Sequence, residues 1–328
     1  MLQYLVILLN DASTSYCHYQ PHPQPLSQSE GRKSLMPIDT LKNGIRFGMK
    51  ENLMIQYVYP IQTLPEEYKN VIESIDHSKI KLVNATTPNP SFPKEGSKDA
   101  DVLVVNEWDT LPQKAEVPIV IRTSKDDFFA SYKEIFTLLA NAPRVNIGLT
   151  DVEAFTEPDF ETYKTVLAEL GKELERLYVE GKTPQLNLLT DRMMLTQMNN
   201  CGAGDTTITL APNGKFYVCP AFYYEDEKDC IGDLEHGLDV KNKQLYKLEY
   251  APICRHCDAY QCRRCIWLNR KLTLEVNTPS REQCVIAHLE RNASRELLAN
   301  IRKHGTFMPD TEIKEIDYLD PFDKREEW

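Results

Sequence analysis

The sequence predicts an α/β fold with a mostly parallel sheet, followed by a small cysteine-rich domain and a C-terminal helix. Three observations lead to this prediction. The first two hundred residues alternate short apolar runs with amphipathic helical segments, which is typical of a parallel sheet covered by helices. This alternation stops after about residue 195, and eight of the nine cysteines fall between Cys201 and Cys284. Periodicity alone leaves open whether the sheet is open or forms a partial barrel.

The expected elements of the first part follow in order. Apolar runs of strand length predict strands over residues 5–9, 53–59, 80–83, 102–105, 119–121, 145–149 and 186–189. Apolar residues spaced three or four apart predict helices over residues 39–51, 68–75, 124–139 and 156–177. Ser124 with Asp127 and Thr156 with Asp159 are capping pairs for the last two helices. We place the α/β domain at residues 1–195.

Two segments of this domain lack apolar periodicity. Residues 19–34 are rich in Gln, Pro and Ser and predict a disordered insertion. Residues 86–98 contain three prolines and predict a surface loop. We assign no function to either segment.

The last third predicts different structure. Residues 207–210 and 215–218 flank Pro212-Asn213-Gly214, which predicts a hairpin. Little regular structure is predictable from Cys219 to Arg270, and residues 272–276 suggest a short strand. Ser280 with Gln283 caps a helix that runs to about residue 303. We therefore place the cysteine-rich domain at residues 196–303 and an extended acidic tail at residues 304–328.

Charge and hydropathy exclude several classes of protein. The chain has 38 Lys+Arg against 49 Asp+Glu, and the formal net charge of −11 opposes broad binding to nucleic acid or anionic membranes. The longest apolar run, residues 5–9, is far shorter than the roughly 20 residues of a membrane-spanning helix. It also lacks the basic flank and cleavage site of a signal peptide. We expect a cytoplasmic protein with no nucleic-acid or membrane partner.

The cysteine spacing in the last third is typical of a metal or cluster site. Two residues between cysteines let a tight turn direct both sulfurs at one ion or one cluster edge. Two such pairs only four residues apart crowd a single zinc ion and suit a larger inorganic core better. In a reducing compartment metal binding is favoured over disulfides. The pattern reads Cys201-x12-Gly214-x4-Cys219, then Cys254-x2-Cys257-x4-Cys262-x2-Cys265, then Cys284, with Cys230 in the first gap.

The neighbours of these cysteines add detail. Gly214 turns the hairpin so that Cys219 returns beside Cys201, and Cys284 falls in the first turn of the last helix, where free N–H groups favour a thiolate. Cys17 stands alone, and we expect it to be inert rather than a nucleophile.

Basic residues around the four cysteines from Cys254 to Cys265 are expected to offset the charge of a thiolate-bound cluster, or to form a docking face for an acidic peptide. They are Arg255, Arg263, Arg264, Arg270 and Lys271.

At these residues the sequence resembles the SPASM domain, the C-terminal extension of many radical-SAM peptide maturases, which holds auxiliary 4Fe-4S clusters. The part before it is similar to a reduced radical-SAM partial barrel. The whole layout resembles the CXXX repeat peptide maturases, companions of radical-SAM enzymes in systems that modify ribosomally made peptides. The resemblance implies one cluster on Cys201, Cys219 and Cys265, and another on Cys254, Cys257, Cys262 and Cys284.

The sequence departs from the family in two ways. Its first half contains no Cys-x3-Cys-x2-Cys, the motif whose three thiolates hold the cluster that cleaves S-adenosylmethionine, so we expect neither that cosubstrate nor that chemistry. The four cysteines from Cys254 to Cys265 are separated by 2, 4 and 2 residues, where the family usually shows 2, 5 and 3. The number of clusters, one or two, is therefore left open. Cys230 is a candidate fourth ligand of the first cluster. Otherwise one iron has an open site, where a substrate cysteine could coordinate.

These features imply an iron–sulfur peptide maturase component that binds a Cys-repeat precursor peptide and supports a radical-SAM enzyme. The sequence leaves open whether the chain is itself an enzyme. The alternative is a zinc-stabilised peptide- or protein-binding module with no redox role. A third possibility is an enzyme pocket at the strand ends that uses Asp151 or Glu153, although no nucleophile–base pair or phosphate loop supports it.

Overall fold

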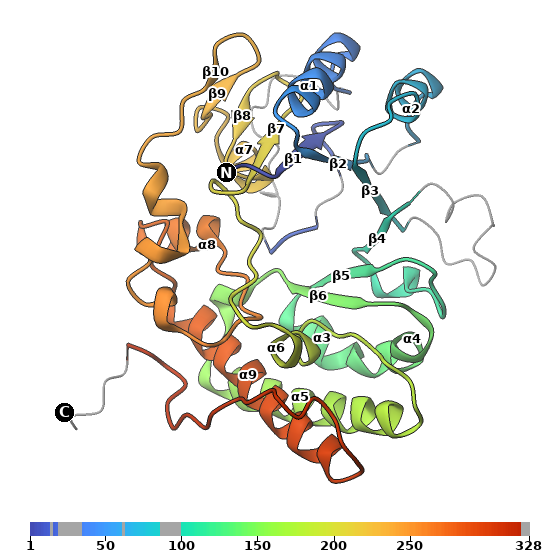
Figure 1. The fold of residues 1–328 in the computed structure, drawn as a ribbon, viewed down its shortest axis with the longest axis vertical. Helices are drawn as coiled ribbons and strands as arrows, with labels where there is room; N and C mark the ends of the chain where they lie inside the picture. The colour runs from blue at the N-terminus through green and yellow to red at the C-terminus, as the bar shows by residue number, and fades with distance from the viewer. Residues whose placement is uncertain (14–15, 19–34, 61–62, 86–99, 323–328) are drawn as a thin grey trace.

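The computed structural model describes residues 1–13, 16–18, 35–60, 63–85 and 100–322. The insertion expected at 19–34, the loop expected at 86–98 and the last six residues of the tail lie outside the described residues. An eight-stranded sheet organises the described part, in the order β6-β5-β4-β3-β2-β1-β7-β8 (Figure 1). Helices cover it, so the predicted α/β class is confirmed, and the sheet is open.

Six parallel strands make up most of the sheet. Each pairs in parallel with the next along the chain, because a connection crosses over between them. Residues 5–9 are at most 1% exposed, which explains why this strand reads as a continuous apolar run. The six strands are β1 (Tyr4–Leu8), β2 (Met54–Val58), β3 (Lys79–Asn84), β4 (Val102–Val105), β5 (Ile119–Thr123) and β6 (Val145–Leu149).

The predicted hairpin belongs to the same sheet. Strand β7 (Thr207–Leu210) pairs in parallel with β1, and β8 (Phe216–Tyr217) returns antiparallel to it. Gly214 has φ +78°, a conformation that side chains disfavour, and its N–H donates to Ala211 O at 3.0 Å. The last third of the chain therefore completes the sheet that the first residues begin.

Helices pack on the sheet and on each other. Helix α1 (Ile38–Lys50) approaches β7 so closely that a Cβ at Gly44 would lie 2.3 Å from Leu210 Cδ2. Helices α2 (Glu66–Glu73), α5 (Glu157–Val179) and α9 (Arg281–Arg302) confirm the predicted ones, with the Thr156–Asp159 capping box present. Helices α5 and α9 lie side by side beyond β6 (Figure 1).

Three local expectations were wrong. The helix expected over 124–139 is split into α3 (Lys125–Ser131) and α4 (Ile135–Asn141) by a 3-10 turn. Residues 186–189 form only one bridge to Val145, because the Thr190 hydroxyl bonds the N–H and C=O of Leu186 and turns the chain into α6 (Thr190–Met194). Residues 272–276 form no strand, since helix α8 (Ile266–Thr273) occupies this segment.

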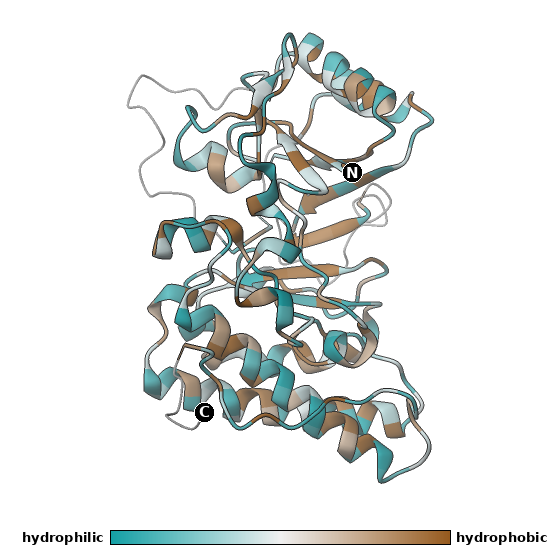
Figure 2. Ribbon diagram, turned by 60° about the vertical axis from the view of Figure 1, so that its left-hand side comes forward, coloured by the Kyte–Doolittle hydropathy of each residue, from teal (hydrophilic) through white to brown (hydrophobic). Residues whose placement is uncertain are grey.

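The rest of the C-terminal third is built from short elements. These are α7 (Pro220–Glu225), the two-stranded sheet of β9 (Gly232–Asp233) and β10 (Gly237–Leu238), and 3-10 turns. Residues 304–322 of the tail contain turns and irregular backbone but no helix or strand, and Ile313 is buried. In Figure 2 apolar residues concentrate in the strands, whereas the helices carry both colours. Within the described ranges, no helix combines the length and hydropathy needed to cross a membrane.

Candidate metal centres

The described cysteines are free thiols, and several lie at the starts of short helices. Cys219 and Cys265 are the N-cap residues of α7 and α8, and Cys284 lies in the first turn of α9. Cys254 lies in a 3-10 turn. Helix starts carry backbone N–H groups without helical partners, and such groups stabilise a thiolate. Backbone N–H groups of α7 and α8 accordingly lower the pKa values of Cys219 and Cys265.

The first cysteine group consists of Cys17, Cys201, Cys219 and Cys265. Burial raises the pKa of the Cys17 thiol to about 12, and the Cys201 and Cys265 thiols raise it further. Burial also raises the pKa of Cys219, and the three other thiols of the group add to the rise. The charges of these four thiols thus act on one another, although Cys17 is almost two hundred residues away in sequence.

The second cysteine group consists of Cys254, Cys257, Cys262 and Cys284. All four line one cavity of about 110 Å³. Burial raises the pKa of Cys284, and the three other thiols of the group add to the rise. The structure thus brings these four cysteines together around one cavity.

Backbone and imidazole groups face the second group. The N–H of Ala259 donates to Cys257 Sγ and the N–H of Arg264 donates to Cys262 Sγ, both at 3.4 Å. His288 Nε2 lies 3.4 Å from Cys257 Sγ, and its Nδ1 lies 2.6 Å from Leu319 O. A carbonyl only accepts, so Nδ1 carries a proton, and a neutral ring leaves Nε2 as an acceptor facing the thiol.

Arg264 lies between the two cysteine groups. Burial lowers the pKa of its guanidinium, whereas thiols of both groups, Cys201 in the first and Cys254 in the second, raise it. Its two terminal nitrogens donate to the carbonyls of Tyr246 and Lys247 at 3.0 and 3.3 Å. Its Nε is buried and has no hydrogen-bond partner among the residues that the structure describes, although a buried N–H normally has one. A sulfur-rich anionic group held by these cysteines would supply an acceptor, so the residues fit such a group.

An ion-pair network fixes the turn that carries Cys257. Asp258 accepts two hydrogen bonds from Arg291, both at 2.7 Å, and one from Arg192 at 3.1 Å. Burial alone would raise the pKa of Asp258, yet these pairs hold it below its ordinary value. Because Arg291 belongs to α9, the network fastens the cysteine turn to that helix.

The other charged residues singled out from the sequence have different surroundings. Arg263 reaches β6, donating to Ile147 O at 3.3 Å, and its charge lowers the pKa values of Cys17 and Cys265. Arg270 pairs with Asp229 at 2.6 Å, Lys271 pairs with Glu153 at 2.6 Å, and Arg255 is exposed. Asp151 accepts the N–H of Lys125 at the start of α3. Glu153 thus belongs to an ion pair, and Asp151 accepts a hydrogen bond at the start of a helix.

Cys230 is exposed. Burial raises the pKa of Tyr217 to about 12, and the Cys230 thiol adds to the rise. Within the described ranges, Cys230 is not among the main groups that shift the pKa values of Cys17, Cys219, Cys265 and Cys284.

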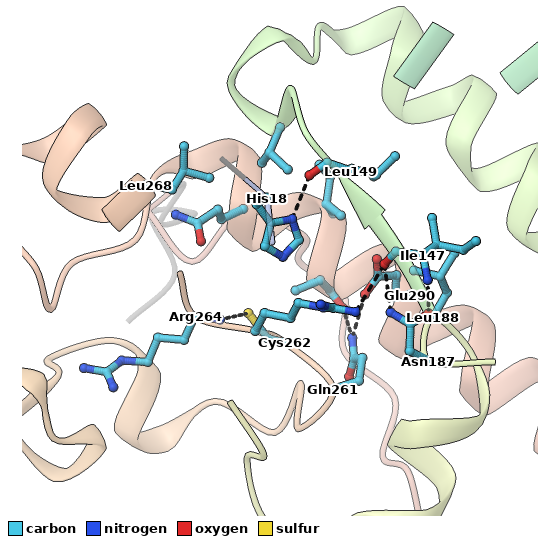
Figure 3. Close-up of a pocket in the computed structure, with 15 residues that line it drawn as sticks. His18, Ile147, Leu149, Asn187, Leu188, Gln261, Cys262, Arg264, Leu268 and Glu290 are labelled. Atoms are coloured by element: carbon cyan, nitrogen blue, oxygen red, sulfur yellow. Dashed lines mark hydrogen bonds between the residues drawn. The ribbon is translucent and has the colours of Figure 1, made fainter. Parts of the chain in front are cut away.

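A small cavity of about 50 Å³ separates the end of β6 from the segment 261–264 (Figure 3). His18 Nδ1 lies 2.7 Å from Leu149 O at the carboxyl end of β6. Glu290 lies on the opposite wall, and burial raises its pKa to about 7 even though Tyr163 donates to it at 2.7 Å. The cavity shows that residues 16–18, β6 and the cysteine segment meet at one place.

Among the described residues, no set of three or more His, Cys, Asp or Glu side chains converges closely enough to hold a single metal ion. A tetrahedral zinc site needs sulfurs roughly 3.8 Å apart, given Zn–S bonds of about 2.3 Å. In a 4Fe-4S cluster each thiolate binds a different iron, so its four sulfurs stand further apart. The two cysteine groups therefore gather sulfurs without the convergence typical of one zinc ion.

Cys17, His18, His288 and Glu290 were not assigned to a site from the sequence. Cys17 was expected to be inert, and nothing in its local pattern relates it to cysteines so distant in the chain. The pair Cys17-His18 was the only local signal. Positions 284 and 288 are one helical turn apart, which would have put His288 on the face of α9 that carries Cys284.

Comparison with known proteins identifies the class of fold. No family model and no curated protein matches this sequence. A solved structure described as native anSMEcpe with bound AdoMet matches with a TM-score of 0.60 and 12% identity, over 92% of this chain and 99% of that one. The same protein with AdoMet and the Cp18Cys peptide matches with a TM-score of 0.59 and 12% identity, over 92% and 100%. This chain therefore shares the fold of anSMEcpe, a protein whose solved structures contain bound AdoMet.

Proposed function

We propose that this chain is an iron–sulfur component for the maturation of a ribosomally made Cys-repeat peptide. It binds the precursor peptide in the cytoplasm and supports a radical-SAM partner, without cleaving S-adenosylmethionine itself. The observation that carries the proposal is the gathering of the C-terminal cysteines into two groups of thiols on a radical-SAM-related fold.

The second cysteine group would hold one 4Fe-4S cluster, and Cys201, Cys219 and Cys265 would contribute to another. Such clusters supply one-electron transfer when bound. The chain's own groups favour the thiolates: the N–H groups of Ala259 and Arg264 donate to sulfur, and the Arg264 guanidinium offsets negative charge. Asp258 and Arg291 keep the Cys257 turn in place on α9.

The absence of S-adenosylmethionine cleavage is proposed from the sequence. The sequence has a single cysteine before Cys201, whereas three are required for the cluster that cleaves this cosubstrate. A peptide partner is supported by the matched structures of anSMEcpe with a bound Cp18Cys or Kp18Cys peptide. The precursor and the radical-SAM enzyme are therefore the partners that we propose.

Metal analysis after strictly anaerobic purification tests the proposal. We expect about eight irons and eight sulfides per chain with a broad visible absorption, for two four-iron clusters. About four irons would support one cluster, and one zinc per chain without iron would overturn the proposal in favour of a zinc-stabilised binding module. The reconstituted protein, given S-adenosylmethionine and a strong reductant, should form no 5′-deoxyadenosine. Formation of that product by the chain alone would also contradict the proposal.

Peptide binding needs its own assay. A synthetic Cys-repeat peptide should bind the anaerobic protein in a titration, and its affinity should exceed that of a scrambled peptide of the same composition. Equal affinity for both peptides would contradict specific recognition of the precursor. Co-purification of a radical-SAM enzyme from cells tests the second partner.

A further inference from the structure

We propose that Cys17 supplies the fourth thiolate of the cluster held by Cys201, Cys219 and Cys265. This inference rests on the proposed function, because it needs the chain to bind an iron–sulfur cluster. The proposed set of ligands joins segments far apart in sequence, since Cys17 belongs to the connection between β1 and α1.

The position of Cys17 is fixed by hydrogen bonds to the main sheet. Arg122, on β5, donates from Nε to Cys17 O at 2.8 Å and from Nη1 to Asn106 at 2.6 Å. The next residue, His18, is held 2.7 Å from Leu149 O at the end of β6. Two neighbouring strands thus hold both residues at the carboxyl edge of the sheet.

The same connection is also fastened to the helix that begins at Cys219. Tyr223, on α7, donates its hydroxyl to Asp11 Oδ1 at 2.6 Å. Burial raises the pKa of the neighbouring Tyr224, and the Ser13 backbone lowers it. The connection that carries Cys17 is therefore tied through Asp11 to the helix that begins at Cys219.

The surroundings of Cys17 suit a cluster ligand. The charges of two thiols, Cys201 and Cys265, and of two guanidinium groups, Arg122 and Arg263, act on its thiol. Four thiolates on a 4Fe-4S cluster leave a net negative charge, and nearby cations reduce the cost of burying it. The four thiols of this group are free, so the structure gives them no disulfide partners.

Cys230 is the competing candidate for the fourth ligand. It is exposed, whereas Cys17 is partly buried, and among the described residues Cys230 is not one of the main groups that shift the pKa values of Cys17, Cys219 and Cys265. With Cys17 as ligand the first cluster has no open iron, so a substrate cysteine has no free site there. The cluster would then bridge the β1–α1 connection and the cysteine-rich segment.

Matched alanine variants of the full-length chain test this assignment. We expect Cys17→Ala to lose between one and four of about eight irons after anaerobic reconstitution, and to change the electron paramagnetic resonance of the reduced protein. Cys230→Ala should match the wild type in both measurements. A Cys17→Ala protein with wild-type iron and spectra, or a Cys230→Ala protein that loses iron instead, would overturn the assignment. A wild type without iron would instead refute the proposed function.

A measurement on the wild type covers the case in which Cys17→Ala does not fold. Alkylation mapped by mass spectrometry is compared before and after the iron is removed anaerobically with dithionite and an iron chelator, which leave the thiols reduced. Cys17 should be protected in the iron-loaded protein and become reactive together with Cys201, Cys219 and Cys265, whereas Cys230 should react throughout. Reaction of Cys17 in the loaded protein, or continued protection while the other three react, would contradict the inference.

Discussion

The ion-pair network beneath Cys257 allows a quantitative test of how the cysteine segment is held on α9. Arg291 is fully buried and Arg192 has a side chain that is 5% exposed, and both pair with Asp258. Replacing Asp258 with Asn keeps the shape of the side chain but leaves two buried guanidinium groups without their counter-charge. Removing one partner of a buried pair typically costs about 3–5 kcal/mol.

The expected cost here is smaller, because the Asp258 side chain is 35% exposed and water screens part of the interaction. We expect Asp258→Asn to lower the free energy of unfolding by about 2–3 kcal/mol. Urea unfolding of the metal-free protein, followed by circular dichroism, measures it without interference from metal. The matched control is Asp239→Asn, whose pair with Lys241 is 67% and 79% exposed and should be worth less than about 1 kcal/mol.

The pH dependence gives the same prediction a second readout. The pairs hold the pKa of Asp258 below its ordinary value, so the folded state binds this proton less tightly than the unfolded state. The stabilisation is present above the unfolded pKa of about 3.9 and is lost as the pH falls through the folded value. The difference between wild type and Asp258→Asn should therefore shrink in acid. Equal unfolding midpoints for Asp258→Asn and Asp239→Asn at neutral pH would refute the reasoning.

Three further predictions concern other parts of the chain. Cys257→Ser should lose iron and lower the melting temperature, because metal binding and folding are coupled in loop-rich segments; an unchanged melting curve would contradict this. Burial raises the pKa of Glu290 to about 7, so the wild type should lose stability as the pH rises from about 4.3 to 7, and Glu290→Gln should abolish that slope in urea midpoints. Gly44→Ala should destabilise the fold by about 1–3 kcal/mol, because its Cβ would lie 2.3 Å from Leu210 Cδ2. Gly171→Ala, with nothing within 4 Å, is its control, and equal stability of the two variants would argue against that close approach.

Most of the sheet was predictable because its strands are buried on both faces. Continuous apolar runs such as residues 102–105 have one simple explanation when helical segments flank them. Residues 186–189 have the same appearance and are equally buried, yet they form turns. The difference lies in the Thr190 hydroxyl, which hydrogen-bonds the N–H and C=O of Leu186 in place of a neighbouring strand. Such a local competitor is invisible to hydrophobic periodicity.

The cysteine site was predictable in part for a related reason. Cys254, Cys257 and Cys262 lie close in sequence, so short turns bring them together and spacing alone indicates a shared site. The approach of Cys17 depends instead on Arg122, His18 and the tyrosines of α7, which act through tertiary contacts. No pattern within the β1–α1 connection encodes those contacts.

The pairing of β7 with β1 has a consequence for how the chain can be dissected. Strand β1 receives its second neighbour only when the polypeptide has grown about two hundred residues further. A fragment that ends before residue 207 would present an apolar strand with one unsatisfied edge, a template for aggregation between copies. Dividing the molecule at the start of its cysteine-rich third would thus damage the half that is kept, and single-residue changes are the sound way to separate the roles of the two parts.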